Sequence, residues 1–306
     1  MLHTEKALTQ LVLPERHSII EPWLSHQSIT LVFGPPSAGK TLWNTSVARA
    51  LASGGMLFGA FPCQKSRVLI VQADMPVSIY QERLQASADT ASDDILVWLT
   101  ENAPLDVLSA AAKHRDVLAQ IREFDPRVVF VDTLRKTHPL DENDSAAPDR
   151  VYGAWRALLP GASFVFNHHA RKAPSQPSSN DVAVREAFRG SVAWAASADS
   201  IISIRRVRKK GSKDWLVQQR FVRTRGCVEP PPLLLKLNES LLLEPASTVP
   251  TLEQQFLAWL AENAQATQND AVTWLTSLRD SKGKEVCGKR RAYRLFDRVN
   301  LAESGL

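Results

Sequence analysis

Residues 28–46 read SITLVFGPPSAGKTLWNTS, in the order strand, glycine-rich loop, helix. Gly34 and Gly39 enclose four residues, and Lys40 and Thr41 complete the pattern G-x-x-x-x-G-K-[ST]. Loops with this pattern wrap backbone N–H groups around a phosphate chain at the N-terminus of a helix. We therefore expect an ATP-binding element, rather than a glycine turn that binds nothing. Its expected phosphate contacts are Gly34, Pro35, Pro36, Ser37, Ala38, Gly39, Lys40, Thr41 and Leu42.

Two acids follow apolar runs farther along the chain. Asp74 comes after the run at 67–72, and Asp132 ends the run VVFVD at 128–132. In an open parallel sheet, ligands bind outside the carboxyl ends of the strands, so both carboxylates are expected beside the phosphate loop. Asp74 is then a candidate general base. Asp132 is a candidate ligand, together with Thr41, of the Mg²⁺ that accompanies ATP.

Another apolar run, SFVFN, ends at His168 and His169. A histidine at a strand end is usually structural, but this pair shares the predicted rim with the phosphate loop and precedes a basic loop at 170–187. We therefore interpret His169 as a sensor of the γ-phosphate. The basic loop has the Pro, Ser and Asn content of a segment that orders when something binds. Its residues Arg171 and Lys172 are candidate contacts to nucleic acid.

The composition is that of a globular protein with room for one large core and a small appended module. The chain has 306 residues, of which 44% are hydrophobic and 23% charged. No run of 18 apolar residues is present to span a bilayer, so we expect no membrane association. The N-terminus lacks the apolar core and cleavage site of a signal peptide, which makes the cytoplasm the expected compartment. Three cysteines, far apart in the sequence, match neither a metal site nor a disulfide framework.

Positive charge is concentrated in one stretch. The net charge is +5, but residues 203–225 carry nine Lys or Arg and one Asp, so that stretch is +8 and the remainder −3. The pattern predicts a hairpin whose tip carries Lys209, Lys210 and Lys213. Such a tip is most often a solvated edge. Beside a phosphate-sensing strand, we favour contact with nucleic-acid phosphates or with a neighbouring subunit's nucleotide.

The chain is expected to divide into four segments. Residues 1–27 form an N-terminal edge segment, 28–244 an α/β core with a mostly parallel central sheet, 245–250 a linker, and 251–306 a small module of three short helices. The module resembles a winged helix-turn-helix, whose last helix would present arginines to a DNA groove, although such modules also bind proteins. The arginines are Arg290, Arg291 and Arg294.

Helical spacing of apolar residues predicts further helices at 76–88, 110–124 and 149–159 within the core. The glycine pair after the first helix begins a passage rich in turns. Residues 134–148 contain four consecutive acidic or amide side chains and are interpreted as a solvated loop, too polar to be buried.

Together these motifs resemble a known family, the RecA-type ATPases of the plasmid RepA-like hexameric replicative DNA helicases. The likeness covers residues 20–240 and is carried by GPPSAGKT, ALASGGMLFGAFP, VLIVQADMP, VVFVDTLRK with DENDS after it, FNHHARK and FRGS. It implies a RecA-like P-loop NTPase core. The family's roles in binding ATP and Mg²⁺, in base catalysis and in γ-phosphate sensing then fall on Lys40, Thr41, Asp74, Asp132 and His169.

The resemblance further implies a homo-hexameric ring with ATP at the subunit interfaces, single-stranded or forked DNA in the channel, replication partner proteins, and an arginine finger from the neighbouring subunit. Arg189 belongs to the FRGS match, whereas Arg205 and Arg206 lie nearer the hairpin position where RecA-type rings often place the finger. One departure concerns Asp74, because the family usually has Glu there. The side chain is one methylene shorter, which would hold the base farther from the attacking water.

Three functions compete. The leading interpretation is an ATP-driven, DNA-stimulated helicase or translocase of a plasmid, phage or integrated element. The second is an ATP-dependent DNA-binding switch, loader or regulator without productive unwinding, which the short side chain of Asp74 favours. The third, a P-loop kinase for a small molecule, would need a lid and an acceptor pocket that the sequence does not reveal, and the concentrated basic charge argues against it.

Overall fold

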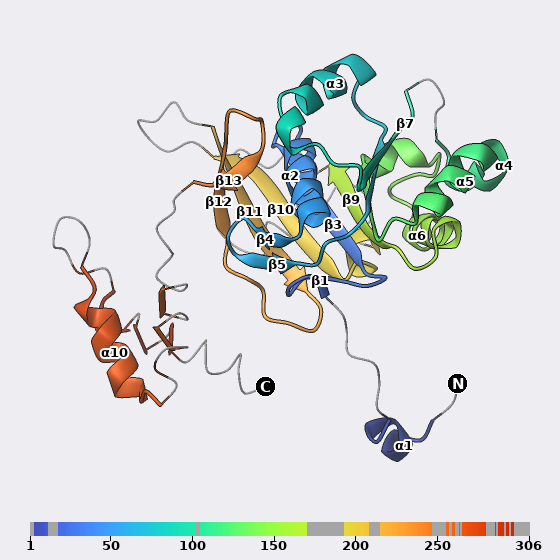
Figure 1. Cartoon of the computed structure of the whole chain (residues 1–306). Coiled ribbons are helices and arrows are strands. Elements are labelled where there is room, and N and C mark those ends of the chain that lie inside the picture. Colours follow the sequence, from blue (N-terminus) through green and yellow to red (C-terminus); the bar gives the residue numbers. More distant parts are fainter. Residues whose placement is uncertain are drawn as a thin grey trace. The chain divides into compact units, whose positions relative to one another are not determined.

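The computed structural model of the chain describes residues 3–11, 18–101, 105–169, 193–207 and 215–246, and then 255–256, 259–260, 263, 265–279, 285, 287–290, 292–293 and 295–296 (Figure 1). The chain divides into two compact units, Met1–Ala246 and Ser247–Leu306. Among the residues described, no helix has both the length and the apolar character needed to cross a membrane.

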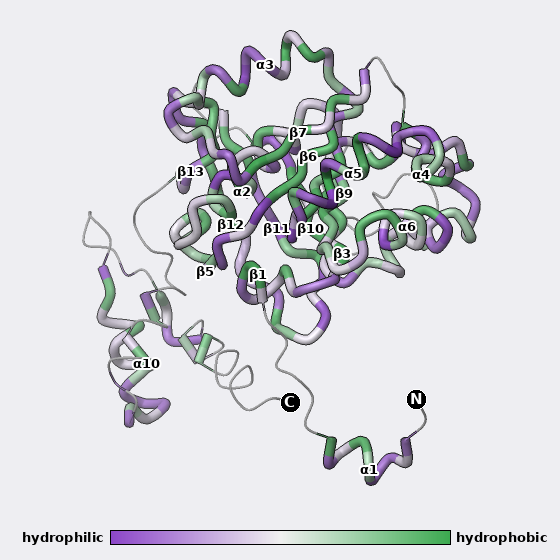
Figure 2. The backbone as a smooth tube through the Cα atoms, turned by 45° about the vertical axis from the view of Figure 1, so that its right-hand side comes forward, coloured by the Kyte–Doolittle hydropathy of each residue, from purple (hydrophilic) through white to green (hydrophobic). Residues whose placement is uncertain are grey.

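A nine-stranded mixed sheet is the centre of the larger unit (Figure 1). In spatial order its strands are β13 (Leu243–Pro245), β12 (Leu233–Leu237), β11 (Leu216–Thr224), β10 (Ser200–Val207), β3 (Ile29–Gly34), β9 (Ser163–His169), β8 (Val128–Asp132), β6 (Val68–Gln72) and β7 (Ile95–Leu99). The strands from β10 to β7 are parallel, and those from β10 to β13 pair antiparallel. Parallel strands covered on both faces require continuous apolar runs, and the central strands carry the hydrophobic colour in Figure 2.

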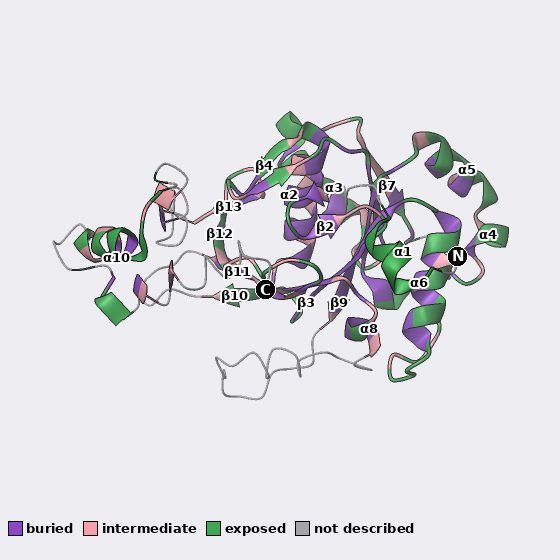
Figure 3. Ribbon diagram, turned by 90° about the horizontal axis from the view of Figure 1, so that it is seen from below, coloured by how far each residue is buried: buried purple, intermediate pink, exposed green. Residues whose placement is uncertain are grey.

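Helices cover both faces of this sheet. On one face lie α2 (Lys40–Ser53) and α3 (Val77–Gln85); on the other lie α4 (Ala110–Lys113), α5 (Arg115–Phe124), α6 (Ala147–Leu158) and α8 (Ala193–Ala196). The two hydrophobic clusters follow the alternation of strand side chains, because Val128 and Phe130 pack on the α2 side whereas Val129 and Val131 pack on the other. Figure 3 shows the central strands and α2 as buried, with exposed surface on the outer helices. The face on which a strand-end side chain lies is therefore fixed by its position in the alternation.

A second, four-stranded sheet combines the predicted N-terminal edge segment with the passage that was predicted to be rich in turns. It has the order β2 (Leu24–Ser25), β1 (Ser18–Ile20), β5 (Phe61–Cys63) and β4 (Gly55–Leu57). The passage after α2 thus forms a short antiparallel hairpin that pairs with the N-terminal segment. The chain also begins with a one-turn helix, α1 (Glu5–Thr9), which is capped by the side chain of Thr4.

Two expectations about the helical side of the core were confirmed only in part. The helix expected at 110–124 is divided into α4 and α5 at His114, whose ring contacts the edge of Trp98 at 5.4 Å between centroids. The segment at 134–148 begins with the 3-10 helix η2 (Leu134–Thr137), and its Leu134 and Thr137 are buried. Leu134 belongs to the hydrophobic cluster on that side of the sheet, which explains why a segment rich in polar residues enters the core.

The remaining predicted elements of the core differ from the structure at their ends. The helix expected at 76–88 is α3, followed by the 3-10 turn η1 (Ala88–Thr90). The basic hairpin is formed by β10 and β11, which pair antiparallel from Ser200 opposite Thr224 to Val207 opposite Leu216. The tip between these strands lies outside the described residues.

The smaller unit contains the helix α10 (Gln268–Ser277). Its N-cap is Thr267, which forms a reciprocal capping box with Asp270. Phe256, Leu275 and Leu295 belong to an apolar cluster in this unit. Other helical positions are described only in pieces, so the winged helix-turn-helix arrangement stays a prediction.

Candidate functional site

The phosphate loop joins β3 to α2 at the carboxyl edge of the parallel strands. Gly34 passes so close to β10 that a Cβ atom there would lie 2.1 Å from the backbone oxygen of Ile204. Gly39 has a φ of 101°, in the left-handed region that glycine adopts without strain. Both glycines of the motif are therefore required by the backbone. The first N–H groups of α2 have no acceptor within the helix, so this end of the helix is suited to an anion.

Lys40 lies across the loop that precedes it. Its Nζ donates hydrogen bonds to the carbonyl oxygens of Gly34, at 2.8 Å, and Pro35, at 3.1 Å. The residue is buried, and this burial lowers the pKa of the ammonium, while the carboxylates of Asp132 and Asp74 act in the opposite direction. Lys40 therefore lies within electrostatic reach of both acids that the sequence placed on this rim.

Thr41 and Asp132 meet directly. The Thr41 hydroxyl donates a 2.6 Å hydrogen bond to Oδ2 of Asp132, which is the last residue of β8 and is 4% exposed. A hydroxyl and a carboxylate are oxygen ligands of the kind that Mg²⁺ takes beside nucleotide phosphates. A buried carboxylate is costly unless it is paired with a cation or with hydrogen-bond donors. The two residues thus fit the magnesium of a nucleotide complex.

Asp74 lies on an exposed turn after β6, and the turn is held by the strand's own last residue. Oε1 of Gln72 accepts the backbone N–H groups of Asp74, at 3.0 Å, and Met75, at 3.1 Å. Burial lowers the pKa values of Lys40 and His169, and the carboxylate of Asp74 opposes this shift in both. This arrangement keeps Asp74 at the carboxyl edge, near the lysine of the phosphate loop.

His169 ends β9 and lies on the same rim. Burial lowers the pKa of its ring, and the ammonium of Lys40 lowers it further, whereas Asp74, Asp132 and Glu142 oppose the shift. At neutral pH the ring is therefore neutral, and a neutral imidazole offers one N–H donor and one acceptor. Such a side chain can respond to a phosphate without adding a permanent charge.

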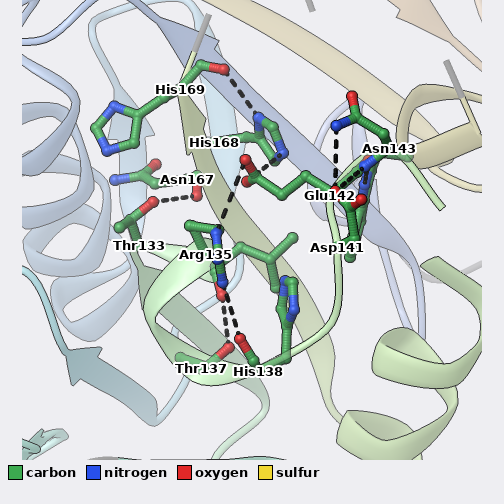
Figure 4. A network of polar contacts seen from close by, with 12 residues as sticks. Thr133, Arg135, Thr137, His138, Asp141, Glu142, Asn143, Asn167, His168 and His169 are labelled. Atoms are coloured by element: carbon green, nitrogen blue, oxygen red, sulfur yellow. Dashed lines mark hydrogen bonds and ion pairs between the residues drawn. The ribbon is translucent and has the colours of Figure 1, made fainter. Parts of the chain in front are cut away.

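His168 points to the other side of β9, toward Glu142, whereas Asn167 and His169 point away from Glu142 (Figure 4). Nε2 of His168 lies 3.4 Å from Oε1 of Glu142, and Arg135 approaches the other carboxylate oxygen at 3.9 Å. The backbone oxygen of Glu142 also accepts a hydrogen bond from Trp194. The contact between Glu142 and His168 thereby connects the segment at 134–148 to β9, the strand that carries His169.

Glu142, Gln72 and Asn167 were not among the predicted site residues. Gln72 and Asn167 each interrupt an apolar run at the carboxyl end of a buried strand, and this signal was available in the sequence. For Glu142 no local signal existed, since its role depends on contacts with His168 and Trp194 from distant parts of the chain.

Of the three finger candidates, Arg205 and Arg206 lie on β10 and are exposed. Nε of Arg205 donates a 2.6 Å hydrogen bond to Gln218 across the hairpin. The guanidinium of Arg206 lies 4.7 Å from the ring centroid of Trp215, a cation–π contact. Trp215 in turn packs against the phosphate loop, because a Cβ on Gly39 would lie 3.1 Å from its ring.

The other predicted contacts are distributed as follows. Arg290 is exposed on the smaller unit. Outside the described residues lie Arg171, Lys172, Arg189, Lys209, Lys210, Lys213, Arg291 and Arg294.

Comparison with known proteins agrees with this geometry. The model of a family described as an AAA domain matches residues 3–175. A KaiC-like protein from the hyperthermophilic archaeon Pyrococcus horikoshii OT3 has a solved structure that superposes with a TM-score of 0.51 at 10% sequence identity, over 76% of this chain and 99% of that chain. At this identity the likeness shows the fold alone, which is that of a RecA-like P-loop NTPase. A search of the curated proteins found no match.

Proposed function

The chain belongs to the AAA domain family, and from this premise we propose that it is an ATP-hydrolysing, DNA-binding ring motor. The specific function that we propose is that of a hexameric replicative DNA helicase or translocase of a plasmid, phage or integrated element. The observation that carries the ATPase part is the 2.6 Å hydrogen bond between Thr41 and Asp132 beside the buried ammonium of Lys40.

The chemistry follows from the side chains on the rim. Thr41 and Asp132 would hold Mg²⁺, which would supply positive charge to offset that of the phosphates. Lys40 supplies a positive charge to the β- and γ-phosphates. Asp74 accepts the proton of the attacking water as general base. His169, neutral at pH 7 because burial lowers its pKa, contacts the γ-phosphate and reports its loss to β9.

The DNA-binding part is supported by charge and by contacts of the basic hairpin with the phosphate loop. Residues 203–225 carry a net charge of +8, whereas the remainder of the chain is −3. Phosphate contacts from such a stretch release counterions and stabilise binding to any sequence. Where the two strands approach the tip, Arg206 makes a cation–π contact with Trp215, which packs against Gly39 of the phosphate loop. A change in the conformation of the phosphate loop on ATP binding or hydrolysis would thus change the conformation of the hairpin.

We further propose a homo-hexamer in which a neighbouring subunit supplies the arginine finger to each ATP. Arg189, Arg205 and Arg206 are the candidates for that finger. Single-stranded DNA, or the single-stranded arm of a fork, occupies the channel, and the smaller unit contacts DNA or a replication partner protein.

The test of this function is ATP turnover with and without single-stranded DNA, followed by strand displacement on a forked duplex. We expect DNA to stimulate turnover and ATP to drive displacement, with Lys40→Ala as the inactive control. Native mass spectrometry with ATP and Mg²⁺ should detect six subunits. A rate of ATP turnover that is the same with and without DNA would contradict the proposed motor.

The hairpin is tested by neutralising Lys209, Lys210 and Lys213 together. We expect weaker DNA binding and a flatter salt dependence, because each lost phosphate contact lowers the counterion-release slope by roughly one. The measurement is DNA affinity at several salt concentrations, with Lys65→Ala as a control lysine in an exposed ion pair of the same unit. An unchanged slope would make the hairpin an ordinary solvated edge.

A second function is favoured by the short side chain of Asp74. A base held too far from the attacking water gives slow hydrolysis, which suits a switch, loader or regulator that holds ATP and DNA. Strand displacement separates the two functions, since the switch binds forked DNA in an ATP-dependent way but does not open it.

A further inference from the structure

Three polar side chains form a row across neighbouring strands beside the phosphate loop. Gln72 is paired with Asp132 in the register of β6 and β8. Val131 is paired with Phe166 in the register of β8 and β9, and Asp132 and Asn167 are the next residues of these two strands. Neighbouring strands lie about 4.8 Å apart. Asp132 is therefore flanked on both sides by a side-chain amide.

All three side chains lie on the α2 face. Val68 and Ile70 of β6, Val128 and Phe130 of β8, and Val165 of β9 pack in the cluster on that side. Gln72, Asp132 and Asn167 follow these residues at even spacing, so their side chains share the face that carries Lys40 and Thr41.

The two amides are buried and have unused hydrogen-bonding capacity. Gln72 is 2% exposed and Asn167 is fully buried. Within the described part of the chain, neither Nε2 of Gln72 nor Oδ1 or Nδ2 of Asn167 has a hydrogen-bond partner. An unpaired buried amide is destabilising, so native proteins keep such groups where water, an ion or a ligand completes their hydrogen bonds.

We propose that Gln72 and Asn167 are positioning residues for the Mg²⁺ bound at Thr41 and Asp132. Oδ1 of Asn167 accepts a proton from a water ligand of the metal, and the NH₂ group of Gln72 donates a hydrogen bond to the carboxylate of Asp132 that holds it. The inference rests on the proposed ATPase function. Mg²⁺ keeps several of its waters when it binds through one or two protein oxygens and substrate phosphates. Those waters turn their oxygen atoms to the metal and donate their protons outward, so they need acceptors. Oδ1 of Asn167 is such an acceptor on one side of the metal-binding carboxylate, and the NH₂ group of Gln72 is a donor on the other side.

The remaining contacts of the two residues agree with this role. Oε1 of Gln72 already accepts the two backbone N–H groups that hold the turn of Asp74, which leaves its NH₂ group available as a donor. The backbone oxygen of Asn167 accepts a 2.8 Å hydrogen bond from Thr133, which fixes the strand while leaving the side chain free to bind water. Gln72 thus connects the metal site to the candidate base.

The experiment measures the Mg²⁺ dependence of nucleotide binding, using a fluorescent ATP analogue and the full-length chain. The variants are Asn167→Leu, which fills the space with an apolar group, Asn167→Ala, which leaves room for water, and Gln72→Met. Thr30→Val is the matched control, because Thr30 lies on the same face of β3, is fully buried, and has a hydroxyl without a partner among the described residues. Thermal unfolding verifies that each variant is folded.

We expect every variant to bind the analogue without Mg²⁺ as the parent does. The Mg²⁺ concentration at half-saturation should rise about tenfold or more in Asn167→Leu and Gln72→Met, since outer partners of metal sites typically contribute 10–100-fold. Asn167→Ala should shift it less, because water replaces the amide, and Thr30→Val should not shift it. If Asn167→Leu does not fold, the other two variants carry the test.

The experiment distinguishes a failure of the inference about the two amides from a failure of the proposed function. If the parent shows Mg²⁺-dependent binding and hydrolysis while the Asn167 and Gln72 variants match it, the amides have no role at the metal and the inference is wrong. An equal shift in Thr30→Val would also overturn it, because any loss of a buried polar group would then suffice. Parent protein whose nucleotide binding ignores Mg²⁺ would overturn the proposed function as well.

Discussion

The two ends of the parallel strands are built differently. At the amino end, charged side chains form ion pairs at the surface: Arg67 and Asp125 meet at 2.8 Å, and Lys65 and Asp94 at 3.0 Å. At the carboxyl end, Lys40, Gln72, Asp132 and Asn167 are buried, and the side-chain amide of Asn167 lacks partners in the described structure. The amino end follows the rules of a stable surface, whereas the carboxyl end departs from them.

The difference shows that the carboxyl end of the strands contains polar groups that lower the stability of the fold and that can serve a chemical function. Buried, incompletely paired polar groups are destabilising, and proteins keep them mainly at functional sites. The same strands carry both ends, so the contrast does not arise from a difference in the apolar runs. Substitutions at the carboxyl end should therefore change activity, while matched substitutions at the amino end should change little.

The largest effect is expected from Lys40→Ala. The phosphate charge would lose its compensating ammonium, and ATP turnover should fall by about a hundredfold to a thousandfold. Steady-state hydrolysis measures the loss, and Lys65→Ala at the amino end is the control. Comparable loss in both variants, or retained turnover in Lys40→Ala, would remove the contrast between the two ends.

The next effect concerns Asp74. Asp74→Asn should retain nucleotide and DNA binding but lose about a hundredfold in turnover, because an amide cannot accept the proton of the attacking water. Asp74→Glu should hydrolyse as fast as the parent or faster, since the added methylene brings the carboxylate closer to that water. Nucleotide affinity is measured separately from turnover. Parent-like hydrolysis by both variants would show that Asp74 is not the base.

A smaller effect, on stability, is expected from Gly34→Ala. The new Cβ would lie 2.1 Å from the backbone oxygen of Ile204, and forcing β3 and β10 apart should cost about 1–3 kcal/mol in the free energy of unfolding. Gly153→Ala in α6 is the control, since its Cβ would meet nothing within 4 Å. Urea unfolding compares the two. Equal stability of Gly34→Ala and the parent would mean that the strands are not so closely apposed.

The smallest effect is expected at the amino end, from Asp125→Asn. The Arg67–Asp125 pair is largely exposed, with 45% and 77% of the two side chains accessible, so its loss should cost no more than about 1 kcal/mol. Turnover should not change. A large fall in turnover with unchanged stability would show that the amino end also participates in catalysis.

Local patterns in the sequence were enough to predict the elements that form the rim. The phosphate loop is a continuous motif, and Asp132 ends an apolar run, so each could be placed at a strand end without knowledge of the fold. The α/β class followed from the same alternation of apolar runs and helices, and the RecA-like core was implied by the family resemblance of the motifs. The family match and the structural likeness support that coarse conclusion.

Features that depend on contacts between distant segments could not be predicted. The row of Gln72, Asp132 and Asn167 depends on the register of three strands that are far apart in the sequence. Glu142 is partly buried because its carboxylate pairs with His168 and its backbone oxygen accepts a hydrogen bond from Trp194. These contacts decide its position although its own segment is rich in polar residues. In each case tertiary packing, and not local propensity, decided the outcome.

The most direct test is an experimental structure with a non-hydrolysable ATP analogue and Mg²⁺. We expect the phosphates on the N-terminus of α2, with the γ-phosphate at Lys40, the metal at Thr41 and Asp132, and the carboxylate of Asp74 facing the γ-phosphate. A nucleotide bound away from the carboxyl end of the strands, or a metal that contacts neither Thr41 nor Asp132, would contradict the assignment of that edge as the catalytic site.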